Sequence, residues 1–236
     1  MDPRRVRKAL NGVLPVLKPH GITSAQLLNQ LKEKLQEELS SILPAYDVKL
    51  GHGGTLDSTA TGVITVGVGT GCQQLKCLIT MMKQFEHVTE DALQERLRQF
   101  QGRIKQIPPP YSALKCKGRR YSDLAMKGVN FTIEPRLVHC YELKLKSFEP
   151  PYFTVSVDTG PGFYVRSLIN DLGLAVGSCA HVCELQRTKQ GPFTLYHSLH
   201  KDQWTLKNVI QNIIKFRKTI NIYYRNFELD KKGSGW

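Results

Sequence analysis

The chain reads Lys49-Leu50-Gly51-His52-Gly53-Gly54-Thr55-Leu56-Asp57 and, shortly afterwards, Gly62-Val63-Ile64-Thr65-Val66-Gly67-Val68-Gly69. The first segment is rich in glycine, which predicts a loop that can turn tightly and come close to a ligand. The second is rich in β-branched residues, which predicts a buried strand. A loop with one carboxylate directly before a core strand is therefore the first candidate for a functional site.

Helices and strands are mixed irregularly on both sides of this loop. Residues 13–17 predict a strand. Leucines recur every four residues from Leu27 to Leu39 and predict an amphipathic helix capped by Thr23 or Ser24. Further along we expect helices at 73–82, from Thr89, and at 123–127, 167–175 and 205–218, and strands at 141–145, 153–157, 182–185 and 192–195. This order without a βαβ repeat predicts an α+β fold, with a mixed, mostly antiparallel sheet and flanking helices.

The composition points to a polyanionic partner. The 236 residues include 33 Lys and Arg against 20 Asp and Glu, a formal net charge of +13, which favours nucleic acid or an anionic membrane surface. No apolar run is long enough to span a membrane, and the basic start lacks the apolar core of a secretory signal. The six cysteines form no CxxC pair or zinc spacing, which predicts reduced core residues in an intracellular protein, with no bound metal.

Two groups of residues could carry chemistry. The Asp57 carboxylate could attack an electrophilic carbon or act as a base, although a lone aspartate in such a loop is more often a turn or cap residue. His52 beside it could be a base or contact a phosphate. If residues 163–166 are extended, Tyr164 and Arg166 share one face, where an aromatic ring can stack on a base and a guanidinium can pair with an anion. An amphipathic edge strand is the alternative for that pair.

A third candidate is the basic segment, which we define as residues 101–120. It contains no Asp or Glu and is interrupted by Tyr111. Its cations are Arg103, Lys105, Lys115, Lys117, Arg119 and Arg120. Contacts with a phosphate backbone are one interpretation, and a solvated charged face is the other.

Four segments, taken in order, closely resemble the motifs of the TruB-type tRNA pseudouridine synthases. They are Lys18-Pro19-His20-Gly21-Ile22-Thr23-Ser24, Gly51-His52-Gly53-Gly54-Thr55-Leu56-Asp57, Pro108-Pro109-Pro110-Tyr111-Ser112-Ala113-Leu114-Lys115 and Gly162-Phe163-Tyr164-Val165-Arg166-Ser167-Leu168. The resemblance covers about residues 12–200, and its Gly-His-Gly-Gly form is more similar to the eukaryotic branch.

The resemblance implies an enzyme that isomerises uridine 55 in the T-loop of tRNA to pseudouridine, with no metal or organic cofactor. Asp57 matches the catalytic aspartate, acting as nucleophile on the ribose anomeric carbon or as base in a glycal route. Arg166 matches the arginine that pairs with this aspartate and keeps it ionised. Tyr164 and Leu185 match pocket residues, and His52 matches the histidine that helps to flip nucleotides out.

The chain also departs from the family pattern. The family carries a strand with a tyrosine that stacks on the target base, and nothing between Met82 and Phe85 matches it; Gln73 stands where the family usually has lysine. The alternative function is therefore an RNA-binding or tRNA-folding protein of the same fold with impaired catalysis.

The resemblance also sets the expected organisation and partners. We expect a catalytic domain over residues 10–200, a helical extension over 201–230 without an RNA-binding PUA domain, and a disordered tail or cloning remnant over 231–236. Lys18 and the cations of the basic segment are expected to contact the RNA backbone. The expected partners are the T-arm of tRNA and other RNAs with a T-loop-like hairpin, bound by a monomer with no membrane contact, in the nucleus, the cytoplasm or the mitochondrion.

Overall fold

The computed structural model describes residues 2–68, 75–82, 88–112, 114–116, 118–129 and 131–233. Contacts divide the chain into two compact units: unit 1 combines Met1–Gln74 with Arg187–Trp236, and unit 2 is Leu75–Gln186. Strand β10 (His181–Gln190) begins in unit 2 and ends in unit 1.

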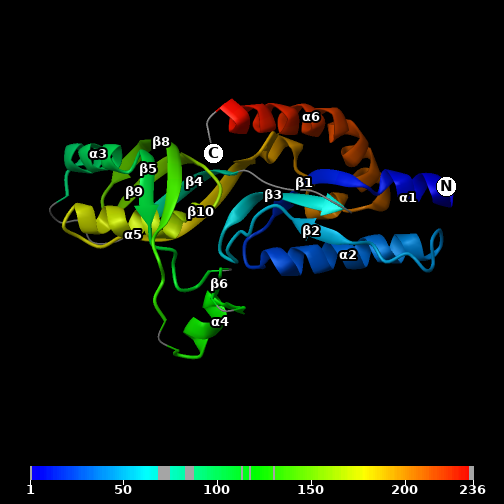
Figure 1. Ribbon diagram of the computed structural model, residues 1–236, viewed down its shortest axis with the longest axis horizontal. Coiled ribbons are helices and arrows are strands. Elements are labelled where there is room, and N and C mark those ends of the chain that lie inside the picture. Colours follow the sequence, from blue (N-terminus) through cyan, green and yellow to red (C-terminus); the bar gives the residue numbers. More distant parts are fainter. Residues whose placement is uncertain are drawn as a thin grey trace. The chain divides into compact units, whose positions relative to one another are not determined.

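Unit 1 is a small antiparallel sheet with long helices beside it (Figure 1). Its elements are α1 (Pro3–Ala9), β1 (Gly12–Lys18), α2 (Ser24–Ser40), β2 (Leu50–His52), β3 (Thr61–Val68), β11 (Phe193–Thr194), two 3-10 turns (Leu195–His197 and Lys201–Gln203) and α6 (Leu206–Gly233). Strand β3 pairs antiparallel with β1 and with β2, and β11 pairs antiparallel with the end of β10. The predicted strands at 13–17 and 62–69 are therefore confirmed as β1 and β3.

The predicted helix after Thr23 is confirmed, and its cap explains where it begins. The Thr23 hydroxyl accepts a hydrogen bond from the Gln26 N–H (3.1 Å), and the Gln26 side chain accepts one from the Thr23 N–H (2.8 Å), which is a capping box. The leucine stripe is fully buried against apolar residues of β1, β3 and α6. Burial of this stripe fixes the position of α2 in unit 1.

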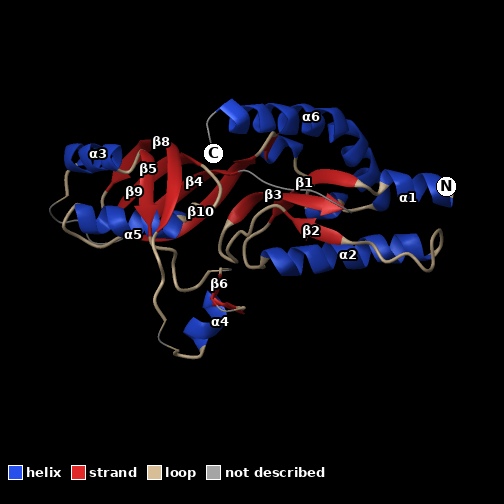
Figure 2. Cartoon of the chain, in the orientation of Figure 1, coloured by secondary structure: helices blue, strands red, loops and turns tan. Residues whose placement is uncertain are grey.

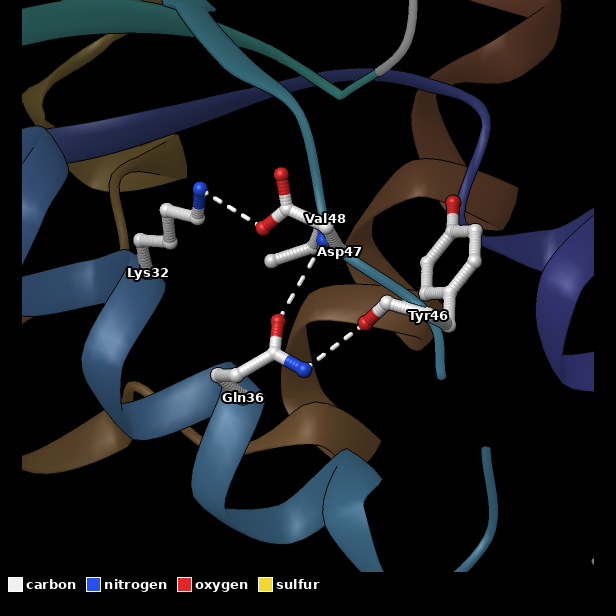
Figure 3. Close-up of polar contacts among 5 residues, drawn as sticks. All are labelled: Lys32, Gln36, Tyr46, Asp47 and Val48. Carbon is white, nitrogen blue, oxygen red and sulfur yellow. Dashed lines mark hydrogen bonds and ion pairs between the residues drawn. The ribbon is translucent and has the colours of Figure 1, made fainter. Parts of the chain in front are cut away.

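A glutamine ties the loop after α2 back to that helix (Figure 3). The Gln36 amide donates to the carbonyl of Tyr46 (2.7 Å) and accepts from the N–H of Val48 (3.3 Å). Lys32 adds an ion pair with Asp47 at 2.7 Å. These contacts set the path of the chain into β2.

Unit 2 contains a sheet with the strand order β10-β4-β9-β8-β5, in which β4 and β9, β9 and β8, and β8 and β5 pair antiparallel. Its other elements are β4 (Leu75–Met82), α3 (Glu90–Gln99), β5 (Gly102–Gln106), the hairpin β6 (Lys115–Cys116) and β7 (Arg119–Arg120), α4 (Tyr121–Met126), β8 (Arg136–Glu149), β9 (Tyr152–Thr159) and α5 (Val165–Ala175). Alternate residues of β9 are buried against α3 and α5, as its period-two pattern predicts. Together the units confirm the α+β class and the mostly antiparallel pairing.

The helix predicted at 73–82 is wrong, because Leu75–Met82 is strand β4 (Figure 2). It pairs with β9 along its whole length, from Leu75 opposite Thr159 to Met82 opposite Tyr152. Its apolar run lacks a clear period, so long-range pairing decides its conformation. The strand contains no tyrosine. The stretch from Met82 to Phe85, which lacks the family's tyrosine-bearing strand, continues beyond Met82 into residues outside the described part, and Gln73 also lies outside it.

The C-terminal helix is longer than predicted. Helix α6 extends well beyond the predicted 205–218 and includes residues 231–233, while residues 234–236 lie outside the described part. No helix in the described ranges is both long and apolar enough to cross a membrane.

The cysteines only partly follow the expected pattern. Cys140 is buried in the core of unit 2, as predicted, but Cys179 and Cys183 are exposed, so the prediction is wrong for those two. Cys72 and the side chains of Cys77 and Cys116 lie outside the described part.

Candidate active site

Asp57 lies half-buried on the loop between β2 and β3. We name residues 53–60 the Asp57 loop. The Asp57 carbonyl accepts from the Ala60 N–H (3.1 Å), which closes a tight turn around the carboxylate. Ser24, the first residue of α2, both donates to the Leu56 carbonyl (3.0 Å) and accepts from the Leu56 N–H (2.9 Å). The helix start therefore fixes the residue directly before Asp57.

Lys18 is a second anchor of this loop. Its side chain is fully buried, and the ammonium donates to the carbonyls of Ala60 (2.6 Å), Pro19 (2.9 Å) and Ser58 (3.2 Å). The predicted contact of Lys18 with the RNA backbone is therefore wrong: three main-chain oxygens inside the protein take the place of phosphate. Burial lowers the pKa of Lys18 to about 8, the Asp57 carboxylate opposes this shift, and the Arg187 guanidinium adds to it.

This shifted pKa predicts a pH effect on stability. In the unfolded chain the Lys18 pKa returns to its usual 10.5, so between about pH 8 and pH 10.5 the unfolded state binds more protons than the folded state. Stability attributable to Lys18 therefore rises with pH in that window. Between pH 8 and pH 10, the free energy of unfolding of wild type should rise by about 2 kcal/mol more than that of Lys18→Met, as measured by urea unfolding at each pH. Lys34→Met, on the exposed side of α2, is the control and should leave this pH dependence unchanged. If the free energy of unfolding depended on pH in the same way for wild type and Lys18→Met, the burial of the Lys18 ammonium would be contradicted.

Two further side chains hold the Asp57 loop, and no local sequence pattern selects them. Arg187 and Gln190 lie at the end of β10 and are only 2% and 1% exposed. Arg187 donates to the carbonyls of Thr55 (2.9 Å) and Gly54 (3.4 Å), and Gln190 donates to the carbonyl of Gly53 (2.7 Å). Both are far from the loop along the chain, so only the folded arrangement reveals them.

His52 lies on β2, opposite Val66 of β3, and is half-buried. Burial and the nearby Arg187 guanidinium lower the pKa of His52, while a contact with the Gly54 backbone opposes them. The imidazole is therefore neutral at pH 7 and can donate or accept a hydrogen bond without carrying charge. Its predicted part in flipping nucleotides stays a prediction.

Tyr164 and Arg166 do not share a strand face, so that interpretation is wrong. Tyr164 is the N-cap of α5, and Arg166 lies in the first turn of the helix. The N–H of Tyr164 donates to the Gln106 side chain (2.7 Å), and the Arg166 guanidinium donates to the carbonyl of Tyr111 (2.8 Å). The start of α5 therefore holds the proline-rich part of the basic segment.

Leu185 lies half-buried on the part of β10 that belongs to unit 2, as Tyr164 and Arg166 do. Asp57 and His52 belong to unit 1. The structure thus gathers His52 with Asp57 in one unit and the three other predicted pocket residues in the other. The predicted pairing of Arg166 with Asp57 stays a prediction.

The basic segment is not a simple loop, because it forms β5 and the β6–β7 hairpin. Its described cations Arg103, Lys105, Lys115 and Arg119 are all exposed, as a contact with phosphate requires. Lys117 and the side chain of Arg120 lie outside the described part. Within the described ranges, no three His, Cys, Asp or Glu side chains are grouped as metal ligands would be.

Comparison with known proteins places these features in a family. The N-terminal domain model of the TruB family pseudouridylate synthases matches residues 41–87 and 78–165, and the C-terminal domain model of tRNA pseudouridylate synthase B matches residues 166–227. The two N-terminal matches share residues 78–87, which include the stretch from Met82 to Phe85 where the sequence departs from the family pattern.

Among curated relatives, human pseudouridylate synthase TRUB1 is 41% identical over 238 residues, covering 87% of this chain and 68% of the relative. The tRNA pseudouridine synthase B of Pseudomonas aeruginosa is 34% identical over 220 residues, covering 83% of this chain and 69% of the relative. A solved Cbf5-Nop10-Gar1 complex matches with a TM-score of 0.62 and 26% identity, covering 95% of this chain and 62% of that one. The chain thus spans less than two thirds of that solved chain. The matches to both family models and to these relatives show that it belongs to the TruB family of pseudouridylate synthases.

Proposed function

We propose that this protein isomerises uridine to pseudouridine in tRNA, with Asp57 as the catalytic carboxylate. In this reaction the bond from the ribose C1′ to N1 of uracil breaks and a bond from C1′ to C5 forms. The proton on C5 is released to solvent, and N1 takes up a proton. Asp57 acts as nucleophile at C1′ or as the base of a glycal route. The observation that carries the proposal is the half-buried Asp57, held on a loop with four buried polar anchors, in a chain of the TruB family.

The finer parts of the proposal concern the substrate and the setting. The substrate is uridine 55 in the T-loop, other RNAs with a T-loop-like hairpin are also bound, and the protein acts as a monomer inside the cell without a cofactor. By their resemblance to the family motifs, Arg166, Tyr164 and Leu185 would complete the nucleoside pocket, with the Arg166 guanidinium as the partner of the Asp57 carboxylate.

The proposal is tested by tritium release. A tRNA transcript labelled with tritium at C5 of uridine should lose about one tritium per molecule when it is incubated with the protein. A transcript with cytidine at position 55 should lose none. Binding without release, or equal release from both transcripts, would overturn the proposal.

The affinity for tRNA should fall steeply with salt, because phosphate binding displaces condensed counterions. Replacing the exposed Lys105, Lys115 and Arg119 together by glutamine should reduce the slope of log K against log salt concentration by about 2 to 3. Filter binding over a range of potassium chloride measures this slope. The single variant Lys34→Gln on α2 serves as a charge control, and an unchanged slope in the triple variant would show that the basic segment does not contact the RNA backbone.

A further inference from the structure

The peptide groups that lead to Asp57 are held by two side chains of one strand. Gln190 donates to the Gly53 carbonyl at 2.7 Å, and the two terminal nitrogens of Arg187 donate to the next two carbonyls, of Gly54 at 3.4 Å and Thr55 at 2.9 Å. Three consecutive carbonyls are thus fixed just before Leu56 and Asp57. A planar guanidinium suits adjacent acceptors, which a lysine ammonium cannot match with the same geometry.

The two side chains also orient each other. The Gln190 carbonyl oxygen accepts from the Thr65 N–H of β3 (2.7 Å) and from the Arg187 guanidinium (3.3 Å). The Gln190 amide is therefore held from both ends, and it limits the rotation of Arg187. Both residues are almost fully buried, so water does not compete for these hydrogen bonds.

The backbone close to this pair is constrained at two glycines, by its conformation at Gly54 and by crowding at Gly62. Gly54 has φ +147°, and a Cβ placed there would lie 3.4 Å from the Gln190 amide nitrogen and 3.8 Å from the Arg187 guanidinium. The main chain of Arg187 is in turn pressed against Gly62 of β3. The Arg187 side chain, which donates to the Asp57 loop, therefore extends from a main chain that is itself packed against β3.

We propose that Arg187 and Gln190 are positioning residues that hold the Asp57 loop in the orientation needed for the reaction. The inference rests on the proposed function of Asp57. Neither residue needs to touch the substrate, because both act through the peptide groups of residues 53–55. Since small displacements of a reacting group cost orders of magnitude in rate, loss of these bonds should affect the chemical step more than binding.

The test uses two variants. Arg187→Lys keeps the positive charge but loses the planar guanidinium that donates to two adjacent carbonyls, and Gln190→Met replaces the side-chain amide with an apolar group of similar size. Both are assayed in the full chain by single-turnover tritium release with enzyme in excess, and by filter binding. We expect the rate constant to fall by about 10- to 100-fold while the dissociation constant for tRNA changes less than about 2-fold.

The matched control is Gln36→Met (Figure 3). Gln36 also lies in unit 1 and also bridges a carbonyl and an N–H, those of Tyr46 and Val48, on a different loop. Its replacement should lower the urea midpoint of unfolding about as Gln190→Met does, and should leave the rate constant unchanged at a temperature where all variants are folded by circular dichroism.

The possible results separate the two claims. Wild-type release together with wild-type rates for folded Arg187→Lys and Gln190→Met overturns the positioning role alone, as does an equal loss of rate in Gln36→Met. No release by wild type overturns the proposed function and this inference with it. If Arg187→Lys does not fold, Gln190→Met, which removes no charge, decides the matter.

Discussion

Replacing Asp57 with asparagine should reduce tritium release from a tRNA transcript by about 1000-fold or more, while the fold and the affinity for tRNA are kept. Asparagine has nearly the same size but is neither a strong nucleophile nor a base. The anchors Lys18, Arg187 and Gln190 bind main-chain carbonyls of the loop rather than its carboxylate, so the backbone should stay in place. Single-turnover release and filter binding, measured on the same preparation, separate chemistry from binding.

Asp47→Asn is the matched control for this prediction. Its carboxylate is exposed and forms a surface ion pair with Lys32, so its loss should change the rate less than about 2-fold and stability by less than about 1 kcal/mol. If Asp57→Asn instead lost binding and cooperative unfolding together, Asp57 would be a structural residue of the loop. If it kept the wild-type rate, another group would be the catalytic one.

Local sequence signals correctly predicted the main helix and the central strand of unit 1, α2 and β3. Thr23 and the leucine stripe identified α2, and β-branched residues identified β3, because caps and hydrophobic period act within a few residues of chain. The same reasoning was wrong for Leu75–Met82, whose conformation depends on pairing with β9, and for Arg166, where the helix begins earlier than Ser167.

The family motifs pointed to Asp57 and His52 as candidates, but the buried side chains that hold the Asp57 loop could not be inferred from the local sequence pattern. Lys18 belongs to a recognised motif, yet nothing in its neighbours says that its ammonium is buried. Arg187 lies in a strand of mixed character, where an arginine is usually exposed. Its burial depends on the loop carbonyls of Gly54 and Thr55, 133 and 132 residues away in the chain, and such contacts appear only in the folded structure.

The largest loss of stability is expected for Gly62→Ala. Gly62 has φ +115°, which strains any residue with a side chain, and an added Cβ would overlap the carbonyl oxygen of Arg187 and lie 2.7 Å from its nitrogen. These are main-chain atoms of a paired strand, so they cannot move aside as the tip of a flexible side chain could. Strain and overpacking together should cost about 3 to 5 kcal/mol in urea unfolding.

Gly128→Ala is the comparison variant, at a glycine with a positive φ but without crowding. Gly128 also has a positive φ, of +65°, but nothing lies within 4 Å of the position that its Cβ would occupy. Its replacement should therefore cost only about 1 kcal/mol. Similar losses for the two variants would mean that the Arg187 main chain is not held against β3. A much larger loss for Gly62→Ala is expected from its less accessible φ together with its overlap with the Arg187 main chain. Because the Arg187 side chain supports the Asp57 loop, any folded fraction of this variant should also be slow in tritium release.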